Sequence, residues 1–111
     1  MEDQSPFTRS RELEISLVSL LASLDADWLS LPEREQVARL KHQATDIRLD
    51  IRDYGMAETL AEQQKLAREA HKRLEQLQQS IVKASEYGLF GAVDVAHLSA
   101  TIQQIIADIK E

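Results

Sequence analysis

The chain contains no cysteine, and its 111 residues include only two prolines, three glycines and few aromatic side chains. Without cysteine it has no disulfide bonds, no thiolate catalysis and no cysteine-based zinc site. No apolar run approaches the 18 or more residues of a membrane-spanning helix, and no alternating β-branched run suggests a strand. We therefore expect an all-α protein without a membrane span. The acidic start, Met1-Glu2-Asp3, argues against a signal peptide and for a cytoplasmic location.

The net charge of -6 is distributed unevenly along the chain. Residues 32–87 carry ten acidic and ten basic side chains and are neutral as a segment. Residues 1–31 carry six acidic and two basic side chains, and residues 88–111 carry three acidic and one basic. The acidic excess therefore lies entirely in the two flanking segments. This balance opposes general binding to nucleic acids or anionic membranes, which depends on neutralising phosphates.

Two long helical patterns, over about 31–54 and 57–86, form the centre of the chain. In both, apolar or small residues recur at spacings of three and four, as in a coiled-coil seam. The first seam consists of Val37, Leu40, Ala44, Ile47, Ile51 and Tyr54. The second consists of Leu60, Gln63, Ala67, Ala70, Leu74, Leu77, Ile81 and Ala84. Because Gly55 lies between them, we expect an antiparallel coiled-coil hairpin with its turn at this glycine.

Two shorter helices are expected on either side of the hairpin, over about 6–29 and 94–110. The first has a main apolar stripe that ends at Trp28 and a second, nearly opposite line, which predicts burial on two sides, either within the bundle or at an interface. The second has one stripe made of Val95, Leu98, Ile102, Ile105, Ile106 and Ile109. We therefore predict a single domain, 1–111, that folds as an all-α four-helix bundle built on the long hairpin, with the two shorter helices packed against it.

Polar residues mark the expected starts of these helices. Ser5 precedes Pro6, which fits the first helical position, and Ser30 with Glu33 forms the pattern of a capping box. Asp94 is expected to cap the last helix, with Val93 and Leu98 as a hydrophobic staple. Leu89 and Phe90, in the connector before it, are expected to plug one end of the bundle.

The residues that carry chemistry form no recognisable catalytic or metal-binding pattern. Histidine phosphotransfer domains are acidic four-helix bundles of similar length, but their lysine and glycine after the histidine are absent at His42, His71 and His97. A carboxylate-bridged di-iron bundle needs Glu-x-x-His, and only Asp94-x-x-His97 comes near that spacing. Phosphate-binding glycine loops and Gly-x-Ser-x-Gly are also absent. We therefore expect no enzymatic activity, no catalytic residues, no cofactor and no metal.

One basic line keeps nucleic-acid binding open as an alternative function. Arg34, Lys41 and Arg48 recur at one heptad position of the helix expected over 31–54. Basic residues at a seam edge more often shield the core with their stems and pair with acids.

A second, short pattern also bears on nucleic-acid binding. Asp94-Val95-Ala96 resembles the opening of a helix-turn-helix of the LacI repressor type, but the turn glycine of that motif is missing.

The sequence also contains more apolar residues than the core of a small bundle needs. These residues can form a large private core or a surface for a partner, and sequence does not separate the two. The candidate interface residues lie off the main seams or at the end of the last helix: Ile15, Val18, Leu29, Leu49, Leu66, Ile105 and Ile109. The predicted function is a non-enzymatic protein–protein interaction module, an adaptor or a small chaperone-like protein, and we expect it to be a homodimer.

Overall fold

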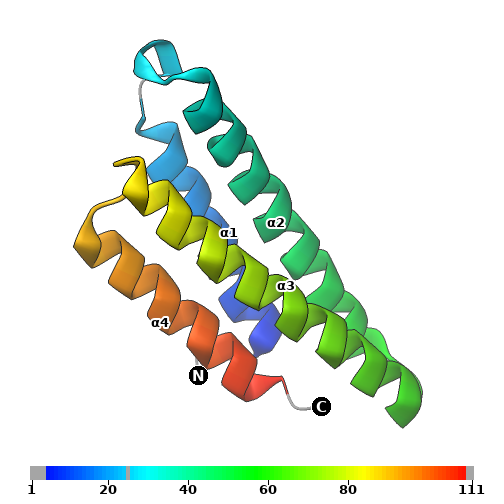
Figure 1. Ribbon diagram of the computed structural model, residues 1–111. Coiled ribbons are helices and arrows are strands. Elements are labelled where there is room, and N and C mark those ends of the chain that lie inside the picture. The colour runs from blue at the N-terminus through cyan, green and yellow to red at the C-terminus, as the bar shows by residue number, and fades with distance from the viewer. Residues whose placement is uncertain (1–4, 25, 110–111) are drawn as a thin grey trace.

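The computed structural model describes residues 5–24 and 26–109, and within these ranges the chain forms four α-helices and one 3-10 turn. The elements are α1 (Pro6–Ala22), η1 (Ala26–Trp28), α2 (Leu31–Met56), α3 (Leu60–Glu86) and α4 (Ala92–Asp108). The helices run up and down in sequence order, and α4 closes the bundle by packing against both α3 and α1 (Figure 1). The expected all-α four-helix bundle, with its hairpin of α2 and α3, is confirmed.

The predicted caps at the first two helix starts are present. The Ser5 side chain accepts a hydrogen bond from the Thr8 N–H over 3.2 Å, and Pro6 begins α1. At α2, Ser30 and Glu33 form the complete capping box. The hydrogen bonds from the side chain and the backbone of Ser30 lower the pKa of the Glu33 carboxyl, because they stabilise its charged form.

The first helix ends earlier than the sequence predicts. The sequence predicts a helix that ends near Leu24 or Leu29, but α1 stops at Ala22 and only the short η1 follows. The Ser23 side chain donates to the Leu20 carbonyl over 2.6 Å, and the Leu24 N–H bonds three residues back to Leu21. A serine that bonds its own backbone competes with helix continuation, so the last turn tightens and ends.

The turn of the hairpin lies beyond the glycine that was expected to form it. Gly55 is helical, and α2 continues through it to Met56. The chain reverses over residues 57–59, where Ala57 is extended and Thr59 caps α3 by accepting from the Glu62 N–H. The prediction that Gly55 ends α2 in a left-handed conformation is therefore wrong, because a threonine cap and an extended alanine suffice to make this turn.

The left-handed glycine is instead Gly88, after α3, with a φ of 79°. The Leu89 N–H bonds to the Ala84 carbonyl over 3.1 Å, and the Gly88 N–H bonds to the Ser85 carbonyl over 2.9 Å. This pair of bonds is a Schellman motif, which satisfies the last carbonyls of α3. It turns Leu89 and Phe90 inward, and both are buried at the end of the bundle as predicted.

The start of α4 differs from its prediction. Gly91 occupies the cap position and makes no side-chain cap bond, so Asp94 lies inside the first turn rather than before it. There its carboxylate still faces the positive end of the helix dipole. Val93 is 82% exposed, so the expected staple between Val93 and Leu98 does not form. The predicted end of this helix, at about residue 110, lies outside the described residues.

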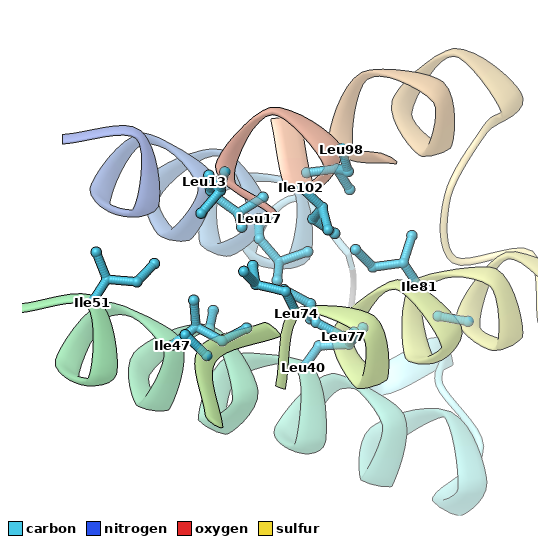
Figure 2. Close-up of a cluster of buried hydrophobic side chains, with 14 of the residues drawn as sticks. Leu13, Leu17, Leu40, Ile47, Ile51, Leu74, Leu77, Ile81, Leu98 and Ile102 are labelled. Atoms are coloured by element: carbon cyan, nitrogen blue, oxygen red, sulfur yellow. The ribbon is translucent and has the colours of Figure 1, made fainter. Parts of the chain in front are cut away.

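The core runs along the axis of the bundle, where the seams of α2 and α3 meet single stripes from α1 and α4. Figure 2 shows Leu17 of α1 and Ile102 of α4 pointing toward Leu74 of α3, and all three side chains are fully buried. Each such side chain contributes about 1.5–3 kcal/mol through the hydrophobic effect. Among the described residues, no helix has the length and apolar character required to span a membrane.

Ion pairs at the edges of the core tie neighbouring helices together. Arg48 of α2 donates to Glu14 of α1 over 2.7 Å, and Arg9 of α1 lies 3.1 Å from Asp108 of α4. All four side chains are partly exposed, so each pair adds at most about 1 kcal/mol. The pairs therefore set the register of α1 against its neighbours more than they stabilise the fold.

The hairpin extends well beyond the two shorter helices. At 1.5 Å per residue, the 26 and 27 residues of α2 and α3 span about 40 Å, whereas the 17 residues of α1 and of α4 span about 25 Å. Figure 1 shows the turn between α2 and α3 projecting past the start of α1 and the end of α4. Met56 and Leu60, at this tip, are 71% and 69% exposed.

Candidate functional site

The candidate interface residues fall into three groups in the structure. Ile105 and Ile109 are fully buried within the chain, so their assignment to an interface is wrong and they belong to the core. Leu29, Leu49 and Leu66 are half-buried. Ile15 and Val18 are 59% and 39% exposed. The isoleucines at positions 102, 105 and 109 are enclosed because α1 and α3 both pack against α4.

The exposed side of α1 carries a line of apolar residues, Ile15, Val18 and Ala22, which we call the α1 outer line. The residues follow one another at spacings of three and four, so they share one face of the helix. The other apolar line of α1, which includes Leu13 and Leu17, is buried. Because α2 and α4 cover only one side of this helix, burial of both sides within the bundle is wrong, and burial of the second side at an interface stays a prediction.

A groove runs between α1 and α4 next to the α1 outer line. It consists of two adjoining hollows of about 250 and 420 Å³, which share Ser16 and His97. The smaller hollow is completed by Glu12, Leu13, Leu98 and Thr101. The larger is completed by Ile15, Ser19, Leu20, Ser23 and Asp94. We call this feature the α1–α4 groove.

The charged groups of the α1–α4 groove are acidic. Its lining includes Glu12 from one helix and Asp94 from the other, and neither lysine nor arginine is among the described lining residues. Arg11 lies in a separate hollow of about 260 Å³ on the α2 side of Ile15, where it accompanies the Arg48–Glu14 pair. Ile15 lines both this hollow and the groove, and so forms the ridge between an acidic and a mixed surface.

The sequence did not predict the exposure of several apolar residues near the start of α2. Trp28 is 84% exposed, although it was predicted to lie in the main stripe of the first helix. Because η1 breaks the helix before it, its position no longer follows the helical period. Leu31, at the first position of α2, is 70% exposed. The helix-breaking sequence Ser23-Leu24-Asp25 was the available signal for this change of direction.

A polar hollow of about 370 Å³ lies between α2 and α3 and is lined by residues of these two helices. Its main feature is Arg73, which lies 3.0 Å from Asp50 and 3.6 Å from Asp46. Burial raises the pKa of the Asp50 carboxyl, and the nearby Arg73 guanidinium opposes this rise. Lys72 and Glu69 complete a mixed charge distribution. The hollow therefore offers no net charge or apolar floor that would select a ligand.

The basic line considered for nucleic acids is not an isolated set of cations. Arg48 is paired with Glu14, while Arg34 and Lys41 are exposed on the same helix. The histidines are likewise dispersed. His71 contacts the Ile109 carbonyl at the end of α4, and His42 and His97 are exposed on α2 and α4. In the described part of the chain, no group of three or more His, Cys, Asp or Glu side chains is placed to hold a metal ion.

The α1–α4 groove also brings hydroxyl, imidazole and carboxylate groups of two helices near one another. An activated serine requires a base within hydrogen-bond reach. Among the described side chains, His97 makes no hydrogen bond to Ser16 or Ser19, and the Thr101 hydroxyl donates to the backbone carbonyl of His97 over 3.1 Å. This arrangement is a polar rim rather than an assembled catalytic pair. No family model matches the chain, and neither a curated protein nor a solved structure shows significant similarity to it.

Proposed function

We propose that this protein is a non-enzymatic protein–protein interaction module, an adaptor or a small chaperone-like protein, and that it docks through the exposed side of α1. The observation that supports this proposal most directly is the exposure of Ile15 and Val18 on a helix that is already anchored by a buried stripe on its other side. An anchored helix presents these side chains in a fixed geometry, so little conformational entropy is lost when a partner covers them.

Self-association into a homodimer is the form of docking that we propose for the isolated chain. Two copies of α1 packed antiparallel about a two-fold axis between Ile15 and Val18 place the isoleucine of each copy near the valine of the other. Four apolar side chains then lose their contact with water. At about 25 cal/mol per Å² of apolar surface, this burial favours association.

The test is the molar mass of a matched pair of variants. Val18→Asp places a charge in the α1 outer line, and Val82→Asp makes the same change on α3, where the valine is similarly exposed. Light scattering across a hundredfold range of concentration should give a dimer for the wild type and for Val82→Asp. It should give a monomer for Val18→Asp, with an unchanged circular dichroism spectrum. The reason is that a dimer of Val18→Asp would bury an unpaired carboxylate from each copy at the contact.

Two results would contradict the homodimer. A wild-type chain that stays monomeric at every concentration removes self-association and leaves docking to another protein. A dimer that is dissociated by Val82→Asp and not by Val18→Asp moves the contact away from α1.

Nucleic-acid binding through Arg34, Lys41 and Arg48 is the alternative function, and it has less support. Arg48 already pairs with Glu14, and the chain carries a net charge of -6. Affinity for a polyanion depends on how many phosphates the protein neutralises. Beyond Arg48 the line adds only Arg34 and Lys41, and two cations on an acidic chain neutralise few phosphates.

A further inference from the structure

We infer that the α1–α4 groove receives a basic amphipathic helix of a partner protein. This inference rests on the proposed function, because it names the kind of partner that the exposed side of α1 recognises. It is supported by three properties of the groove, namely its length, its floor and its charge.

The length of the groove matches a short helix. Along α1 its lining extends from Glu12 to Ser23, a separation of eleven residues or about 16 Å. The two hollows share Ser16 and His97, so they form one continuous depression rather than two separate pits. About three turns of helix fill this length, which corresponds to apolar anchors at positions i, i+4, i+7 and i+11 of the occupant.

The floor and walls of the groove favour close approach of a backbone. Leu13 and Leu98 are buried at its base, and Ile15 and Leu20 supply apolar surface higher up. Between them α1 presents serines along the wall, at positions 16, 19 and 23. These small side chains leave room for the ridge of an incoming helix, and their hydroxyl groups can bond to polar groups beside its apolar stripe.

The charge of the groove selects a basic occupant. Glu12 and Asp94 are its charged lining groups, and neither takes part in an ion pair among the described residues. A helix with lysine or arginine beside its apolar stripe complements both acids, whereas an acidic helix or a polyanion is repelled.

The groove and the proposed dimer contact share Ile15, which lies in the α1 outer line and in the larger hollow. A helix seated in the groove therefore covers part of the surface that a second copy would use. The two occupants exclude one another, so binding of the partner helix should convert a dimer into two one-to-one complexes.

The experiment uses two synthetic helical peptides of about 14 residues. Both carry leucine or isoleucine at positions i, i+4, i+7 and i+11, and they differ only in having lysine or glutamate at the flanking positions. Isothermal titration calorimetry with the full-length wild-type chain should detect binding of the basic peptide, weakening as salt is raised. The acidic peptide should show no binding under the same conditions.

A pair of variants with the same net charge locates the site. Glu12→Lys combined with Asp94→Asn changes the groove, whereas Glu75→Lys combined with Glu58→Gln makes the same charge change at exposed positions on α3 and in the hairpin turn. The groove variant should bind the basic peptide about tenfold or more weakly. The control variant should bind it as the wild type does. A third variant, Ser19→Trp, fills the groove at an exposed position and should weaken binding with no change in charge.

The outcomes separate this inference from the proposed function. Equal binding of both peptides, or equal weakening by the groove and control variants, overturns the basic helix as occupant. If neither peptide binds while Val18→Asp still dissociates a dimer, the inference fails and the proposed function stands. If neither peptide binds and the wild type is a monomer at every concentration, the basic helix and the homodimer both fail.

Discussion

Two glycines of this chain occupy opposite backbone conformations, and the difference determines what each contributes to stability. Gly88 has a φ of 79°, which costs any residue with a Cβ about 1–2 kcal/mol. Gly55 lies within α2, and a Cβ built on it meets no atom within 4 Å. Glycine is necessary at the first position, whereas at the second it weakens a helix that alanine would support.

Alanine substitutions at these two glycines should therefore have opposite effects. Gly88→Ala should lower the free energy of unfolding by about 1–2 kcal/mol, because it strains the Schellman turn. Gly55→Ala should raise the free energy of unfolding by up to about 1 kcal/mol, because alanine loses less backbone entropy in a helix. Urea denaturation followed by circular dichroism measures both. A loss of stability in Gly55→Ala would mean that this residue is not helical.

Local features could be predicted from the sequence where a side chain bonds to its own stretch of backbone. The capping box of Ser30 and Glu33 is such a case, because both partners lie within one turn of the chain. The helical conformation of Gly55 could not be predicted, since glycine permits a turn without requiring one. The place of Asp94 could not be predicted either, because a carboxylate is favourable both at the cap position and within the first helical turn.

At the scale of the element, the sequence of α1 alone does not determine how much of its apolar surface is buried. The helix has a main apolar stripe and a second apolar line, and the neighbouring helices decide whether the second line is also buried. In the structure Leu17 is fully buried and Ile15 is 59% exposed, two positions apart on the same helix. The same ambiguity placed Ile105 and Ile109 in the candidate interface, because their burial depends on α1 and α3 rather than on their own spacing.

A matched pair of truncations on α1 tests which line is core. Leu17→Ala should lower the free energy of unfolding by about 2–5 kcal/mol, since it leaves a cavity among buried side chains. Ile15→Ala should change this free energy by about 0.5 kcal/mol or less at a protein concentration where the chain is monomeric. Thermal unfolding at low concentration provides the comparison. Equal losses from the two variants would show that both lines are buried within the single chain.

The candidate site could be predicted only in part, because a groove is a property of two elements. The sequence indicated surplus apolar residues on the first helix and an acidic excess in both flanking segments. It could not show that Glu12 and Asp94, which are 82 positions apart, line one depression. That juxtaposition depends on α4 closing the bundle against α1, which follows from the packing of all four helices.

At the scale of the whole molecule, the unequal helix lengths give an elongated shape. The radius of gyration of the Cα atoms is 14.5 Å and the principal extents are 48, 30 and 17 Å. A typical domain of this length has a radius of gyration of about 13 Å. The difference arises from the projecting tip of the hairpin, where α2 and α3 contact one another without cover from α1 or α4 (Figure 1). Stability should therefore be distributed unevenly along the same two helices.

Native-state amide exchange should reveal this distribution. Amides of residues 52–56, near the tip, should exchange through local opening, because Met56 and Leu60 are mostly exposed there. Amides of residues 37–41 lie toward the other end of α2, where Leu40 is fully buried and Leu89 and Phe90 close the bundle. These should exchange with a free energy of opening higher by about 2 kcal/mol or more and close to that of global unfolding. Equal protection in the two segments would mean that the tip is covered in solution, by a second copy or by α1 and α4 in another arrangement.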